Sequence, residues 1–422
     1  MKLHLGMGCL FMLIQFSIKS YRSIKDSAVI SFAASKDKSL ESYLLHPDEK
    51  RALLPAIAIY GANAAGKSNV LHALMTMKDM VVGEAAKISK GQKLPWEPFG
   101  DTTAPTSFEI VFIYQGVRYA YGFSFDAKKI YTEYLYHWPN GREALIFSRE
   151  NGAYEFRENV NEQITLSNRT PDNKLYLVSS NDWNLPQTEN AYKWFLEKLT
   201  FLMEEAPATS ETVAQIASSD EKKARILKEL LLADLGISDV TVKNISGKAP
   251  VIMTTHRVIG ADGSVEHFQL LMDQESSGTQ RFFSRIGGWL QALEDGALLV
   301  VDEIEDSLHP LLTKRLIEMV QDNTINTEGA QLLFTTHDAM LLDLTFFRRD
   351  QIWFAEKDEK SCATELYSLA SFSPRKGKNI RKGYLQGRFG AIPFIGDDGL
   401  WSSSGYSSLE YRKTKRPSYR NG

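Results

Sequence analysis

The sequence predicts an α/β protein with a mixed or parallel sheet, an antiparallel β lobe and a short helical insertion. Three observations carry this prediction. A glycine-rich loop at residues 61–68 lies between an apolar strand-like run and a helix-like stretch. Several strand-like runs follow one another between residues 106 and 147. From residue 297 onward, apolar runs alternate with helical patterns, which favours a parallel sheet covered by helices.

Composition limits the class of protein. A chain of 422 residues allows one large domain with an insertion, or two or three smaller domains. The net charge of −3 provides no global attraction to nucleic acid. Cys9 and Cys362 are too few for a disulfide framework or a zinc site, which fits a reducing cytosol. Since no apolar run reaches the length of a membrane-spanning helix, we expect a cytoplasmic protein without a membrane partner.

The N-terminal region predicts two paired strands. Residues 3–14 superficially resemble a signal peptide but lack a small-residue cleavage site, so we interpret residues 1–11 as an upstream extension. Met12 then begins the folded part, and residues 12–19 alternate as an edge strand would. Residues 29–32 are its expected neighbour.

From residue 12 onward, the sequence pattern divides the chain into four segments. Residues 12–157 hold the glycine-rich loop and an antiparallel meander, recognised by aromatic and β-branched residues with short turns. Residues 158–238 have helical periodicity without sustained heptads, which predicts a helical insertion and no long coiled coil. Strands and helices alternate again in residues 239–396. The Ser-, Tyr- and Arg-rich residues 397–422 predict a flexible tail.

The loop at residues 61–68 fits the pattern G-x-x-x-x-G-K-[ST] at every fixed position. In a strand–loop–helix setting, backbone N–H groups and the helix N-terminus can surround a phosphate chain. Lys67 would reach the β- and γ-phosphates, and the Ser68 hydroxyl would ligate Mg²⁺. The alternative is a glycine turn without a ligand. The expected nucleotide-binding residues are Gly61, Asn63, Gly66, Lys67, Ser68 and Asn69.

Three later sequence elements narrow the class of nucleotide-binding protein. An apolar run ends in Asp302 and Glu303, which suit a second Mg²⁺ ligand and a general base for the attacking water. Ser276, Ser277 and Gly278 precede a helix and could bind an anion; the alternative is a simple N-cap. His337 ends another apolar run and could contact a γ-phosphate or orient the water, although a histidine at a strand end is often structural.

In this order, the motifs resemble the ABC-type ATPases of the SMC, Rad50 and RecF group. Residues 275–281 then resemble the signature, residues 306–310 the D-loop, and residues 19–24 the opening strand and turn, where Arg22 would lie near the nucleotide. The chain departs from the group at Ala64, where many relatives have a glycine, and at Glu275, where they have a leucine. Residues 96–99 and Gln115 are the two candidates for the Q-loop.

A closer resemblance covers most of residues 12–395. Residues 351–358, 365–369 and 383–394 resemble the C-terminal blocks of bacterial abortive-infection ATPases of the RloA/AbiL type and, more distantly, the ATPase of the PARIS antiphage system. This resemblance implies ATP and Mg²⁺ as cofactors, a homodimer or higher oligomer with a composite site, and a Toprim-like or RloB-type effector. It also allows a phage protein as trigger, and DNA or RNA as a partner.

Two other functions stay open at this stage. A DNA-repair or DNA-structure ATPase would act directly on nucleic acid, and basic runs at residues 375–382 and 412–416 could contact phosphate backbones. Solvated surface is the alternative interpretation of those runs. The cytosolic subunit of a membrane transporter would be more compact and would lack residues 158–238 and the C-terminal blocks.

Overall fold

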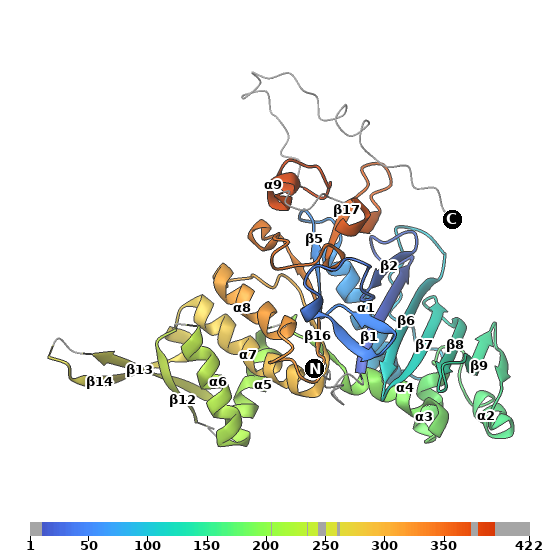
Figure 1. The fold of residues 1–422 in the computed structure, drawn as a ribbon. Coiled ribbons are helices and arrows are strands. Elements are labelled where there is room, and N and C mark those ends of the chain that lie inside the picture. The colour runs from blue at the N-terminus through green and yellow to red at the C-terminus, as the bar shows by residue number, and fades with distance from the viewer. Residues whose placement is uncertain are drawn as a thin grey trace, which may run out of the picture.

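The structure is a computed structural model that describes residues 11–203, 205–233, 235–243, 250–259, 262–372 and 379–392 (Figure 1). The predicted tail at residues 397–422 lies outside the described residues. The same holds for residues 1–10 of the predicted extension, for the basic run at residues 412–416, and for residues 375–378 of the other basic run.

A six-stranded mixed sheet forms the centre of the fold, in the order β11-β15-β16-β5-β17-β18. Neighbouring strands in this sheet are parallel, except for β17 and β18, which are antiparallel. Every residue of β5, β15 and β16 is buried, as expected for apolar strands covered on both faces. This confirms the predicted mixed sheet. The bounds are β5 Ala56–Tyr60, β11 Leu199–Phe201, β15 Leu298–Val301, β16 Gln331–Thr336, β17 Ile352–Lys357 and β18 Thr364–Ser368.

A second, fully antiparallel sheet has the order β10-β9-β8-β7-β6-β1-β2. Strands β6 to β10 follow one another along the chain, which confirms the predicted meander. The bounds are β1 Phe11–Lys19, β2 Ala28–Ser31, β6 Thr106–Tyr114, β7 Val117–Phe125, β8 Ile130–Trp138, β9 Ala144–Glu150 and β10 Ala153–Phe156.

Strand β1 corrects two predictions. It pairs with both β2 and β6, so it is an interior strand and not the predicted edge. It also begins at Phe11, one residue before the predicted start of the folded part. Phe11 pairs with Tyr114, and the two rings meet edge to face at 5.0 Å. This contact explains why the strand includes Phe11.

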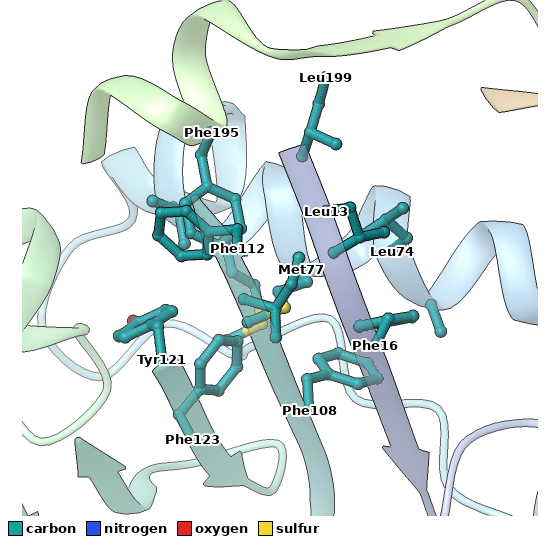
Figure 2. Close-up of a cluster of buried hydrophobic side chains, with 14 of the residues drawn as sticks. Leu13, Phe16, Leu74, Met77, Phe108, Phe112, Tyr121, Phe123, Phe195 and Leu199 are labelled. Atoms are coloured by element: carbon teal, nitrogen blue, oxygen red, sulfur yellow. The ribbon is translucent and has the colours of Figure 1, made fainter. Parts of the chain in front are cut away.

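The side chains of the central sheet separate two cores. Ile57, Ile59 and Val300 face the antiparallel sheet, α1 and α4. Figure 2 shows part of this core, where Phe112 of β6 and Phe195 of α4 lie near Met77 of α1. The other face of the sheet packs against α7 and α8. The helices are α1 Lys67–Val82, α2 Val160–Ser167, α3 Tyr176–Asp182, α4 Pro186–Glu197, α5 Glu205–Ser218, α6 Asp220–Leu232, α7 Ser277–Asp295, α8 Pro310–Gln321 and α9 Ile380–Leu385.

The segment predicted as a helical insertion, residues 158–238, contains α2 to α6. It also contains β11, which pairs in parallel with β15 at the edge of the central sheet. This segment is therefore continuous with the central sheet. Within the described ranges the longest helix is α7, with 19 residues. None of the described helices is both long and apolar enough to cross a membrane.

A three-stranded antiparallel sheet in the order β12-β13-β14 extends away from the body beside α5 and α6 (Figure 1). We call β13 and β14 the arm. The strands of this three-stranded sheet are β12 Ile237–Lys243, β13 Val251–Ile259 and β14 Val265–Leu271, and β14 is largely exposed. A short pair, β3 Leu45–Asp48 and β4 Arg51–Leu53, completes the strands.

Candidate active site

The predicted site elements follow three adjacent parallel strands. The glycine-rich loop follows β5, His337 follows β16, and Asp302 follows β15. Strand β16 lies between the other two and pairs with both. Because the carboxyl ends of parallel strands lie at one edge of a sheet, the fold gathers these groups at that edge, where open α/β sheets bind their ligands.

The N-terminus of α1 is prepared for an anion. Its N-cap, Gly66, has a left-handed backbone with φ of +94° and contributes no side-chain cap. The N–H groups of the first turn therefore lack the side-chain acceptor that usually satisfies a helix start. A helix N-terminus in this state can bind a phosphate, and Ser68 lies in its first turn.

Lys67 is held beside the loop. Its ammonium donates to the carbonyl oxygens of Gly61 at 2.9 Å and Ala62 at 3.2 Å, and the residue is only 5% exposed. Burial lowers the pKa of Lys67, and the carboxylates of the loop after β15 oppose that shift. The lysine is therefore a buried cation within electrostatic range of the acid pair, as a phosphate-binding lysine requires.

The hydroxyl groups of Ser23 and Thr364 and the amide of Asn69 form a hydrogen-bond network that supports the glycine-rich loop. Ser23 Oγ lies 2.7 Å from Thr364 Oγ1, which donates to the carbonyl of Ala65 at 2.9 Å. Asn69 donates from its amide to Ser23 Oγ at 2.6 Å. A Cβ on Gly66 would lie 2.0 Å from Thr364 Oγ1, so glycine is required there by space as well as by φ. Sequence reasoning missed Ser23 and Thr364.

Three further residues of the loop are Ala64, Asn63 and Gly61. Ala64 has φ of +60°, the left-handed region in which glycine is favoured, and this is the position where many relatives have a second glycine. Asn63, predicted to contact nucleotide, is exposed on the loop. Gly61 has no room for a side chain because a Cβ there would lie 2.4 Å from the carbonyl oxygen of Ala355.

The acid pair lies in a strained turn fixed by neighbouring groups. Thr335 donates from its hydroxyl to Asp302 and accepts from the Glu303 N–H at 2.8 Å. Glu303 has φ of +45°, an unfavourable conformation that is typical of functional positions, and its side chain is exposed. Arg285 of α7 donates to the carbonyls of Ile304 and Glu303, which links the signature helix to this turn.

His337 has a partner that the sequence analysis did not identify. One oxygen of Glu305, Oε1, accepts from the His337 backbone N–H at 2.7 Å and lies 2.9 Å from its Nδ1. The His337 side chain is 58% exposed and that of Glu305 is 11% exposed. A third carboxylate so soon after Asp302 and Glu303 was the signal available in the sequence.

The predicted signature begins α7. Ser276 is the N-cap and accepts from the Thr279 N–H at 3.1 Å, as the simple capping alternative requires. Ser276 and Ser277 are both exposed. Gly278 lies against the D-loop, because a Cβ there would be 3.1 Å from the Ser307 carbonyl oxygen. Capping and an exposed surface for a ligand are thus both present.

Glu275 anchors the arm to the signature. Its Oε1 accepts from the hydroxyl of Thr254 and lies 2.7 Å from Nε2 of His256, both in β13. The His256 ring stacks on Phe268 of β14, with centroids 4.9 Å apart. The leucine found here in many relatives could make neither polar contact. Glu275, the residue before the α7 N-cap, therefore connects β13 to the start of that helix.

Arg22 lies in the opening turn and pairs with Glu97. Its backbone N–H donates to the Glu97 carbonyl at 2.8 Å, so residues 96–99 lie against the turn that supports the loop. Gln115 lies in the tight turn between β6 and β7. Of the two Q-loop candidates, residues 96–99 are therefore the ones connected to the site.

These groups fit a magnesium–nucleotide complex. The uncapped α1 N-terminus and Lys67 provide the positive environment that phosphates need. Ser68 and Asp302 offer the oxygen ligands that Mg²⁺ takes together with phosphate oxygens and water. Glu303 and His337 lie in the two loops beside them. The arrangement can bind a nucleoside triphosphate and direct a water at its terminal phosphate.

A protein-family model matches more than half of the chain. The model of the family described as "AAA domain, putative AbiEii toxin, Type IV TA system" matches residues 56–343. No curated protein matches the chain. Among solved structures, the chain is similar to an SMC head domain from Thermotoga maritima, with 12% identity, 84% of this chain and 98% of that chain covered, and a TM-score of 0.38. It is also similar to cbiO1 from Clostridium perfringens, part of the ABC transporter complex cbiONQ, with 11% identity and a TM-score of 0.32. This match covers 90% of this chain and 96% of that chain.

Proposed function

Since this chain belongs to the AAA-domain family that includes the putative AbiEii toxins, we propose that it is a Mg²⁺-dependent ATPase that works as a dimeric switch. One observation carries the proposal: the loop after β5, the acid pair after β15 and His337 after β16 meet at one edge of the sheet. Phosphoryl transfer to water needs a phosphate cradle, a metal and a positioned water, and each has a candidate residue here.

In this mechanism each residue has one task. Lys67 binds the β- and γ-phosphates, and Ser68 and Asp302 hold Mg²⁺, which neutralises charge on the phosphates when bound. Glu303 orients the attacking water and takes its proton. His337 contacts the terminal phosphate. The strained turn at Glu303 keeps its carboxylate out of the sheet, where a water can reach it.

The complete site includes a second copy of the chain. Ser276, Ser277 and Gly278 begin a helix of 19 residues, and both serines are exposed. We infer that these residues contact the γ-phosphate held by Lys67 of a second subunit, so that ATP joins two subunits and hydrolysis releases them. Arg285 connects this helix to the acid turn of its own subunit, so each subunit links its signature to its own metal site.

The cellular role that we propose is abortive-infection defence in the bacterial cytoplasm. The family's description, which includes a putative toxin and a toxin–antitoxin system, supports this role. The switch would control a Toprim-like or RloB-type effector nuclease after a phage protein or a nucleic acid triggers it. The resemblance of the C-terminal blocks to the RloA/AbiL type is the further support.

The test uses Glu303→Gln, which keeps the size of the side chain and removes the base. We expect ATP and Mg²⁺ to convert this variant to a stable dimer on a sizing column, with hydrolysis reduced ~100-fold or more. Lys67→Ala in the same background is the control and should remain monomeric with ATP. A Glu303→Gln variant that binds ATP but stays monomeric would contradict the composite site. A wild-type chain without Lys67-dependent hydrolysis would contradict the ATPase assignment.

A further inference from the structure

Glu305 has an unusual relation to His337. A single carboxylate oxygen contacts two N–H positions of the same residue, the backbone nitrogen at 2.7 Å and ring Nδ1 at 2.9 Å. These two contacts fix the histidine at its backbone and at its ring. Because Glu305 is nearly buried and His337 is largely exposed, the carboxylate is the fixed partner and the imidazole is the group that it holds in place.

We propose that Glu305 is the positioning residue that holds His337 in the orientation and tautomer needed for hydrolysis. The assignment rests on the proposed ATPase function. A carboxylate accepts hydrogen bonds, so the ring nitrogen facing it must carry the proton. Nε2 is then the nitrogen left to face the nucleotide and its attacking water. A carboxylate accepts this hydrogen bond more strongly than the neutral amide of a glutamine would.

The location of Glu305 supports a role in the site. It follows Asp302 by three residues, in the loop that leaves β15, and His337 leaves the neighbouring strand β16. Glu305 therefore lies in the same loop as the acid pair and contacts the histidine of the neighbouring strand end.

The second oxygen of Glu305 is also informative. Oε2 is buried and has no hydrogen-bond partner among the described residues. Leaving a buried acceptor unpaired costs about 1–3 kcal/mol, and such groups call for a functional explanation. A residue needed only to fix the backbone of His337 could be a glutamine, which would accept the same two bonds without a buried charge. The carboxylate at this position favours an electrostatic role.

The experiment separates charge from position. Glu305→Gln keeps an acceptor oxygen for the His337 backbone N–H but removes the charge, and we expect kcat to fall ~10-fold. Glu305→Ala removes both, and we expect a fall of ~100-fold. KM for ATP should change less than about twofold in both variants, because Glu305 does not bind the ground-state nucleotide. Glu318→Ala, an exposed carboxylate of α8, is the matched control and should retain the wild-type rate.

A double-mutant cycle with His337→Ala decides whether Glu305 acts through the histidine. In that background we expect Glu305→Gln and Glu305→Ala to cause no further loss of kcat. Equal losses in both backgrounds would overturn the assignment, as would full wild-type activity of Glu305→Gln. Thermal melts identify a folding defect in Glu305→Ala, in which case Glu305→Gln alone decides. An inactive wild type would refute the ATPase function itself, a result distinct from a failure of this assignment alone.

Discussion

The close packing around Gly66 predicts a specific loss of stability in Gly66→Ala. The new Cβ would lie 2.0 Å from Thr364 Oγ1 and 2.6 Å from Ser23 Oγ, so both hydroxyls must move. Their movement breaks the Ser23–Thr364 contact at 2.7 Å and the bond from Thr364 to the Ala65 carbonyl at 2.9 Å. Each bond contributes about 1 kcal/mol, so the packing part of the loss is about 2 kcal/mol.

A matched control removes the backbone part of the effect. Gly91 also has a left-handed backbone, with φ of +84°, but a Cβ there would meet nothing within 4 Å. Gly91→Ala therefore has only the conformational cost of about 1–2 kcal/mol, and it gains the same unfolded-state entropy as Gly66→Ala. The difference between the two variants isolates the packing around the loop.

Urea unfolding of both variants and the wild type measures this difference. We expect Gly66→Ala to lose about 2 kcal/mol more than Gly91→Ala in free energy of unfolding. In a Thr364→Ala background the nearest obstacle is absent, and the two glycine substitutions should approach each other. Equal losses in the wild-type background would refute the view that Ser23 and Thr364 hold the loop in its phosphate-binding form.

Two further predictions concern other parts of the chain. Glu275→Leu removes the only carboxylate contact of the His256 ring among the residues that the structure describes, and it leaves the Thr254 hydroxyl with the Leu270 carbonyl at 3.3 Å as its acceptor. We expect a loss of about 1–2 kcal/mol in urea unfolding, whereas Glu266→Leu on exposed β14 should lose little; equal losses would contradict the anchoring role. Burial lowers the pKa of His137 below its ordinary 6.5. As the pH falls through 6.5, the imidazole is therefore protonated in the unfolded chain before it is protonated in the folded protein. The wild type should lose stability relative to His137→Gln over this pH range. A wild-type-to-variant difference that is constant across this range would contradict that sign.

Strands that lead directly into a motif were predictable from the sequence. The apolar runs of β5, β15 and β16 each end in the residues that the chemistry needs, so strand and motif identify each other. The antiparallel meander was predictable for a different reason, because aromatic and β-branched runs separated by short turns pair with their neighbours in the chain. In both cases the information is local.

The failures of sequence reasoning are equally specific. The alternation in β1 reports which of its faces are buried, but not how many strands pair with it, so an interior strand was interpreted as an edge. Strand β11 has only three residues and follows a helix, too short a run for any periodicity. Ser23 and Thr364 are 341 residues apart, and no local pattern connects them. Such contacts exist only once the sheet has formed.

Glu275 shows how a departure from a related group can carry information. Its carboxylate is 7% exposed and connects β13 to the start of α7, one residue before the N-cap Ser276. Any displacement of the arm relative to α7 must break its bonds to Thr254 and His256, and breaking hydrogen bonds to a charged group costs about 1.5–3 kcal/mol each. The arm and the predicted signature therefore move together unless these bonds are broken. Since Arg285 donates from the same helix to the Glu303 carbonyl, contacts run from the arm through α7 to the turn that carries the acid pair.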